Sequence, residues 1–106
     1  MITIEQFKTV ELRVATVVAA EPHPNADRLV VVRVDLGGEQ RQIVAGIRGA
    51  YDPAVLVGRQ VVVVANLAPA VLRGIESQGM VLAADGDGAP VLVSPERLVP
   101  AGAVVR

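Results

Sequence analysis

The sequence predicts an all-β domain made of short strands, without any helix of ten or more residues. Runs rich in Val, Ile and Leu recur along the chain, and such residues favour strands. Clusters of Gly, Pro, Asn and Asp separate these runs and predict turns. A chain of 106 residues, 52% of them apolar, can build one core but rarely divides into two. Residues 1–106 are therefore expected to form a single domain.

A short helix is expected first, followed by a strand and a loop. Thr3 can cap the helix, and Gln6 three residues later completes a capping box. The β-branched residues of "LRVATVVAA" predict a strand over 12–20. The segment "EPHPNADR" contains two prolines, Asn and Asp, and is predicted to be a loop.

The next two strands are expected to pair with each other. Apolar and polar side chains alternate over residues 29–36, which directs one face toward the core. That face consists of Val30, Val32, Val34 and Leu36. The sequence "GGE" predicts a turn, after which residues 40–45 form a strand that pairs back.

The second half of the chain completes the barrel. A helical turn is expected after Pro53, then a fourth strand over 60–65 and a fifth over 80–84. The "DGDG" turn leads to a short sixth strand over 91–93, and residues 98–106 close the chain as an apolar extension. Five main strands with a short helix between the third and fourth fit the five-stranded OB barrel.

The composition excludes several classes of protein. No apolar run approaches the roughly 20 residues of a membrane span, and the N-terminus lacks the features of a signal peptide. There is no Cys, and hence no disulfide or zinc-thiolate site. We therefore expect a soluble cytoplasmic protein without a membrane partner. The net charge of −1 means that nucleic-acid binding would need basic residues gathered on one face.

No enzyme signature is found. His23, the only histidine, lies between two prolines and is expected to be an exposed loop residue. The "DGDG" turn is not a calcium loop, because Ala89 and Pro90 stand where a ligand and a glycine are required, and Asp-Gly is typical of hairpins. Phosphate-binding glycine motifs are absent. We expect no enzyme activity, no cofactor and no metal, so binding is the better class of function.

The kind of ligand is limited by the scarcity of aromatic residues. Only Phe7 and Tyr51 are aromatic, and Phe7 is expected to pack down with its helix, so a stacking platform for single strands is disfavoured. A folded nucleic acid read by its shape and backbone needs fewer rings. The candidates for phosphate contacts are Arg28, Arg33, Arg41, Arg48 and Arg73. Arg33 could instead pair with a carboxylate such as Asp35 or Glu39.

Several motifs together resemble the tRNA-binding OB domain family. They are "LRVATVVAAEPHPNADRLVVVRVDLG", "IVAG" and "LVGRQVVVVANLAPAVLRGIESQGMVLAA", all within residues 12–84. That family includes the C-terminal appendage of many methionyl-tRNA synthetases and a free-standing structure-specific tRNA-binding protein. The resemblance implies a domain that binds the outer corner of the L-shaped tRNA and is auxiliary to aminoacylation by methionyl-tRNA synthetase.

The resemblance also implies a site made of two segments, the loop at 25–28 and the glycine-bearing bend at 66–79 with the strand that follows. The implied tRNA-binding residues are Asn25, Arg28, Arg41, Asn66, Leu72, Arg73, Ser77, Gln78 and Met80. Asp27 is expected to fix its loop by hydrogen-bonding nearby backbone. Gly74 and Gly79 are expected to let the bend approach the ligand closely.

These residues would play different parts in binding. The amides of Asn66 and Gln78 can read a base edge or a ribose hydroxyl, and Arg73 can hold a phosphate. Leu72 and Met80 offer apolar faces to an unstacked base, although plain core packing is an equal alternative for Met80.

Partners follow from the same resemblance. The expected partners are tRNA, a second copy of the chain and a methionyl-tRNA synthetase, with segments 1–8 and 98–106 at the dimer interface. Many relatives carry Lys where this chain has Ala68 and Val71, which predicts weaker binding with a smaller salt dependence. Two alternatives remain open. One is an export-linked chaperone that binds unfolded polypeptide, and the other is a domain cut from a longer synthetase.

Overall fold

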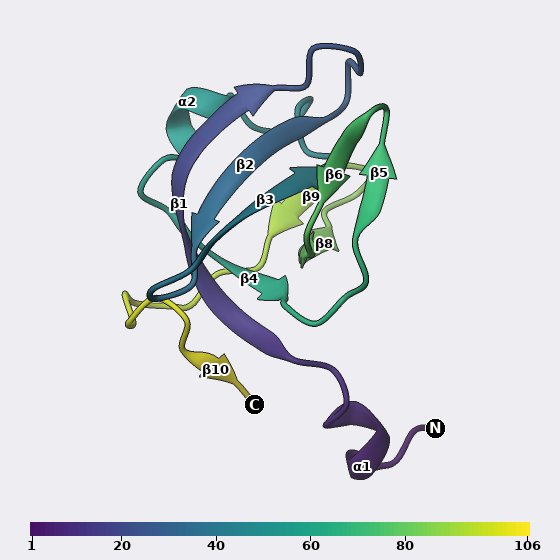
Figure 1. Cartoon of the computed structure of the whole chain (residues 1–106), viewed down its shortest axis with the longest axis vertical. Coiled ribbons are helices and arrows are strands. Elements are labelled where there is room, and N and C mark those ends of the chain that lie inside the picture. The colour runs from purple at the N-terminus through teal and green to yellow at the C-terminus, as the bar shows by residue number, and fades with distance from the viewer.

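The computed structural model describes all residues, 1–106, and shows a twisted barrel with an extension at each terminus (Figure 1). The main sheet has the strand order β3-β2-β1-β4-β7, and β10 also pairs with β1. All its ladders are antiparallel. The strands are β1 (Leu12–Pro22), β2 (Val30–Asp35), β3 (Gln40–Ala45), β4 (Gln60–Val64), β7 (Met80–Val81) and β10 (Val104–Val105). The predicted OB-like barrel is confirmed.

The alternating pattern of the second strand determines which residues form the core. Val30 and Val34 are fully buried and Val32 is nearly so, as the alternation predicts, whereas Arg33 is exposed. These side chains join one apolar cluster with residues of every long strand and of the short helix. The cluster contains Ala15, Val17, Val30, Val32, Val34, Leu36, Ile43, Ala45, Ile47, Leu56, Val61 and Val63.

A β-bulge interrupts the pairing of β1 with β2. The register shifts between Val17 and Ala19, so Val18 has no partner across the ladder. A bulge bends its strand and re-aims the side chains that follow. Beyond it, Ala19 lies opposite Arg33 and Glu21 opposite Val31.

Two short hairpins complete the fold. One consists of β5 (Ala70–Leu72) and β6 (Ile75–Ser77), within the stretch expected to be a bend. The expected strand over 80–84 is divided, because its second half, β8 (Ala83–Asp85), leaves β4 and pairs with β9 (Pro90–Leu92).

The turn between β8 and β9 has the conformation predicted for Asp-Gly. Asp87 and Gly88 both have positive φ, at 58° and 94°. The Gly86 N–H donates to the Ala89 carbonyl at 2.7 Å, which closes the turn. The hairpin interpretation of "DGDG" is confirmed.

Both predicted helices are present. In α1 (Ile4–Phe7) the Gln6 N–H donates to Thr3 Oγ1 at 3.2 Å, and the Thr3 N–H donates to Gln6 Oε1 at 2.8 Å, so the capping box is complete. Helix α2 (Pro53–Leu56) begins with Pro, follows the N-cap Asp52 and buries Leu56. No helix of the structure has the length and apolar character needed to cross a membrane.

The termini lie at the same end of the barrel, as Figure 1 shows. Helix α1 projects away from the barrel and buries none of its residues. The expectation that Phe7 packs down is wrong for the single chain, where this residue is 37% exposed. Helix α1 is four residues long and lies at the end of a segment that points away from the barrel, so no other part of the chain buries its side chains.

Candidate nucleic-acid interface

His23 joins the two segments that the sequence assigned to binding. Its ring is 1% exposed, so the expectation of an exposed loop residue is wrong. The Asn25 N–H donates to Nδ1 at 2.9 Å, which places the ring proton on Nε2. Nε2 lies 2.9 Å from the Leu72 carbonyl oxygen and donates to it. These two hydrogen bonds, the His23 link, hold the 23–29 loop against the β5–β6 hairpin.

Two arginines meet at this junction. Arg28 from the loop and Arg73 from the hairpin turn line one cleft, together with Ala26, Asp27 and Leu29. Both arginines are exposed, and neither takes part in an ion pair. Two unpaired guanidinium groups on one concave surface are suited to phosphate oxygens.

The turn that carries Arg73 has an unusual conformation for this residue. Arg73 and Gly74 form the two-residue loop between Leu72 and Ile75, with φ of 52° and 89°. Positive φ at both positions is the type I′ geometry, which normally selects Asn-Gly. A left-handed conformation costs a side-chain-bearing residue roughly 1–2 kcal/mol. Such strain is often retained at functional sites, so it marks Arg73 as a candidate binding residue.

Ser77, Gln78 and Gly79 close the barrel against other strands. Ser77 is 4% exposed, and its hydroxyl accepts from the Val44 N–H at 2.9 Å and donates to the Gly79 carbonyl at 3.0 Å. Gln78 Oε1 accepts from the Gln42 N–H at 3.1 Å, although the residue remains exposed. Ser77 therefore has no free hydroxyl to offer a ligand.

Gly79 makes its close approach inside the protein. A Cβ at this position would lie 2.9 Å from the Val64 carbonyl oxygen, and φ is 143°. The expected close approach to a ligand is therefore replaced by packing against β4. Gly74 differs, because no atom lies within 4 Å of its added Cβ and only its φ requires glycine.

Asn66 and Arg41 are also engaged within the chain. Asn66 Oδ1 accepts from the Glu11 N–H at 2.8 Å, and Nδ2 donates to the Thr9 carbonyl at 2.6 Å. Arg41 donates to the Ala65 carbonyl and pairs with Glu39. Asn66 therefore anchors the segment that leads from α1 into β1, and Arg41 holds the end of β4.

The remaining candidates face solvent. Met80 is 45% exposed and Leu72 39%, so Met80 is not packed in the core and both offer apolar surface. Asn25 is exposed at the loop rim. Asp27 is exposed too, and its carboxylate accepts no hydrogen bond within the chain. The expectation that Asp27 fixes the loop is thus not met, because the His23 link performs that role.

The family model described as "Putative tRNA binding domain" matches residues 12–104. The chain belongs to this family. The matched region runs from β1 into β10, so the barrel, both hairpins and the two arginines of the cleft all lie within it. The family is a binding domain rather than a catalytic one.

Relatives of this tRNA-binding domain occur in a much larger enzyme. The chain is 50% identical over 105 residues to a methionine–tRNA ligase of Pyrococcus furiosus, covering 99% of this chain and 14% of the ligase. It therefore spans about one seventh of the length of that curated relative.

Two solved structures match over almost their whole length. A MetRS-related protein from Pyrococcus horikoshii superposes with a TM-score of 0.93 at 34% identity, covering 100% of this chain and 98% of the other. The chaperone CsaA from Bacillus anthracis superposes with a TM-score of 0.92 at 31% identity, covering 100% and 99%.

Proposed function

We propose that this domain binds tRNA at the outer corner of its L shape, without catalysis, as an auxiliary to aminoacylation by a methionyl-tRNA synthetase. The observation that carries the proposal is the cleft shared by Arg28 and Arg73 in a member of a tRNA-binding family. The His23 link fixes the backbone of the loop and of the hairpin that carry the two arginines before any ligand arrives. A preorganised cleft of this kind loses less conformational entropy on binding.

Neither His23 nor Ser77, the two candidate catalytic side chains near the binding segments, is available for catalysis. The single histidine has both ring nitrogens hydrogen-bonded to backbone groups and is buried, so it cannot serve as a general base. The Ser77 hydroxyl is likewise engaged on both sides and has no adjacent base.

The proposed direct contacts are those the structure leaves free. Arg28 and Arg73 would bind phosphate, while Leu72 and Met80 would contact an unstacked base. Asn25 is exposed and could bind ribose or base edges. Gln78 is exposed too, but its amide already bonds to the Gln42 N–H and to the Glu76 carboxylate. Asn66, Ser77 and Arg41 would act indirectly, since their polar atoms already hold neighbouring backbone in place.

A second copy of the chain is the proposed partner of the terminal segments. Large apolar side chains are exposed at both ends of the chain, and Figure 1 places these ends on the same side of the barrel. They are Met1, Ile2, Ile4, Phe7 and Val10, with Leu98 and Val104. A homodimer would cover them and present two arginine clefts to one tRNA, which increases affinity by avidity.

The test is a titration of labelled tRNA by fluorescence anisotropy, followed by hydroxyl-radical footprinting of the complex. We expect binding at about 50 mM salt that weakens at about 200 mM, since phosphate contacts release counterions. Protection is expected at the outer corner. A footprint confined to the acceptor end or the anticodon would contradict the proposed mode of binding.

A chaperone function is the second candidate. It is favoured by the likeness to the chaperone CsaA and by the exposed apolar residues of the terminal segments. Suppression of the aggregation of a denatured client, unaffected by added tRNA, would support it. Competition between client and tRNA would instead indicate that both use the arginine cleft.

A further inference from the structure

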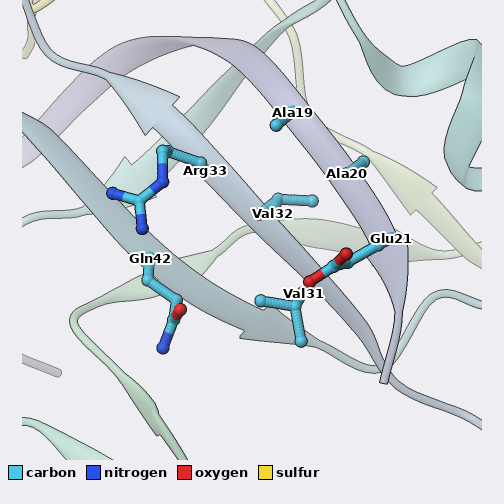
Figure 2. Close-up of a pocket in the computed structure, with 7 residues that line it drawn as sticks. All are labelled: Ala19, Ala20, Glu21, Val31, Val32, Arg33 and Gln42. Atoms are coloured by element: carbon cyan, nitrogen blue, oxygen red, sulfur yellow. The ribbon is translucent and has the colours of Figure 1, made fainter. Parts of the chain in front are cut away.

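A hollow lies on the outer face of the sheet over β1, β2 and β3. It is lined by Ala19, Ala20, Glu21, Val31, Val32, Arg33 and Gln42 and has a volume of about 160 Å³. Drug-sized ligands occupy pockets of roughly 300–1,000 Å³, so this hollow fits a single small ring system. Figure 2 shows Glu21 reaching from β1 over Val31, with Arg33 and Gln42 on the neighbouring strands.

The register of the sheet explains why these side chains share one face. Ala19, Arg33 and Gln42 lie opposite one another across β1, β2 and β3. Glu21 and Val31 form the next outward-facing pair. The bulge at Val18 produces this arrangement, and the small Ala19 leaves space above the sheet. The floor of the hollow is therefore apolar, and its charged groups stand at the sides.

The two charges of the hollow are both unused by the protein. Arg33 makes no ion pair with Asp35 or Glu39, and neither it nor Glu21 forms a side-chain hydrogen bond within the chain. Arg33 and Glu21 are also not paired with each other, although they stand on adjacent strands. Gln42 is held in place by donating from Nε2 to the Glu76 carbonyl at 2.8 Å, which leaves its Oε1 open.

The position of the hollow connects it with the proposed binding site. Glu21 and Pro22 lead directly into the 23–29 loop, and Gln42 contacts β6 of the hairpin that carries Arg73. The strand face between these two loops is where OB barrels hold oligonucleotides. A ligand bound at the arginine cleft would therefore extend over the hollow.

A carboxylate on this face needs an explanation, because the proposed ligand is a polyanion. A free Glu21 would repel phosphates unless it accepts hydrogen bonds from a base. Guanine carries two adjacent donors on its Watson–Crick edge, at N1 and N2, which match the two oxygens of one carboxylate. Cytosine, adenine and uracil each offer a donor at only one position of that edge. The unpaired Arg33 beside it can bind the neighbouring phosphate.

We propose that this hollow is a subsite for an unpaired guanine of the bound RNA, read by the Glu21 carboxylate over the apolar floor of Ala19 and Val31, with Arg33 on the adjacent phosphate. The inference rests on the proposed function in naming RNA as the source of the base. It adds a base preference to a site otherwise expected to recognise shape.

The substitution Glu21→Gln distinguishes recognition of a base by the carboxylate from a purely electrostatic effect of its charge. Removal of a negative charge alone should strengthen the binding of any RNA, whereas loss of the paired acceptor should weaken it. We expect tRNA binding to fall about ten-fold, within the range of a good bidentate base contact. Glu96→Gln is the matched control, because it removes the same charge from an exposed carboxylate that pairs only with Arg97 and does not line the hollow. It should leave the affinity unchanged or raise it slightly, and it should not weaken binding.

A second measurement, titration of the protein with mononucleotides, tests the guanine subsite without tRNA. Amide chemical shifts are recorded during titration with GMP, IMP, which lacks the 2-amino group, and AMP. GMP should shift Glu21, Val31 and Arg33 at lower concentration than IMP or AMP, and Glu21→Gln should abolish that preference. Equal effects of the three nucleotides overturn the guanine subsite, whatever tRNA does. If the wild type binds tRNA and Glu21→Gln binds it equally or more tightly, the guanine subsite is overturned and the proposed function stands. A wild-type chain that binds no tRNA contradicts the proposed function.

Discussion

Removal of the His23 ring should separate the two halves of the arginine cleft. The substitution His23→Ala deletes the hydrogen bonds to the Leu72 carbonyl and from the Asn25 N–H, and it empties a site that is 1% exposed. Each hydrogen bond contributes about 1 kcal/mol, and the lost burial adds a comparable amount or more. We expect the free energy of unfolding to fall by about 3 kcal/mol.

The effect on binding should exceed what lower stability explains. No other hydrogen bond joins the 23–29 loop to the β5–β6 hairpin, so without the His23 link Arg28 and Arg73 are held less firmly in one cleft. We expect tRNA affinity to fall about ten-fold at a temperature where the variant is fully folded. Urea denaturation followed by circular dichroism gives the stability, and anisotropy with labelled tRNA gives the affinity.

Gln60 provides a matched control. It is also a buried polar residue, and it holds the C-terminal extension by exchanging hydrogen bonds with Val99 at 2.7 and 3.0 Å. Gln60→Ala should therefore destabilise the fold to a similar extent. Its tRNA affinity should be unchanged at a protein concentration where light scattering gives it the same molar mass as the wild type, since the C-terminal extension also belongs to the proposed dimer interface. The reasoning is refuted if His23→Ala is folded, destabilised and binds tRNA as tightly as the wild type, or if Gln60→Ala loses as much affinity.

Three further predictions concern other parts of the molecule. Gly79→Ala should lower the free energy of unfolding by about 2–3 kcal/mol, because φ is 143° at this position and the added Cβ would meet the Val64 carbonyl oxygen. Gly74→Ala should lower it by only about 1 kcal/mol, because only the positive φ opposes a side chain there. Equal losses of stability in urea denaturation would contradict this. Val71→Lys adds a cation to an exposed hairpin position and should tighten tRNA binding several-fold at low salt, which anisotropy would measure; unchanged affinity would place the hairpin outside the interface. Phe7→Glu should shift the molar mass from dimer to monomer in light scattering, and a dimer of unchanged mass would exclude α1 from the interface.

Local patterns predicted the strands and helices because the interactions that form them are local. The alternation over 29–36 identified four buried positions, residues 40–45 coincide with β3, and Thr3 and Gln6 form the expected capping box. Each depends on residues within a few positions of one another.

The interactions that assemble the site were not predictable in this way. The His23 ring binds a carbonyl 49 residues away, and Asn66 binds the backbone at Glu11, 55 residues earlier. No sequence pattern specifies such partners. The β5–β6 hairpin was missed because its turn is Arg-Gly rather than the usual Asn-Gly. The exposed Phe7 was mispredicted because nothing within the chain covers α1.

The salt dependence of tRNA binding by the Arg28→Ala, Arg73→Ala double variant tests the central claim most directly. Each phosphate contact contributes about 0.9 to the slope of log affinity against log salt concentration for a duplex. The account predicts that the slope of the double variant is smaller than that of the wild type by about 2, and that Arg97→Ala, which changes an exposed residue paired with Glu96, leaves the slope unaltered. A double variant with the wild-type slope and affinity would contradict the claim that tRNA binds in this cleft.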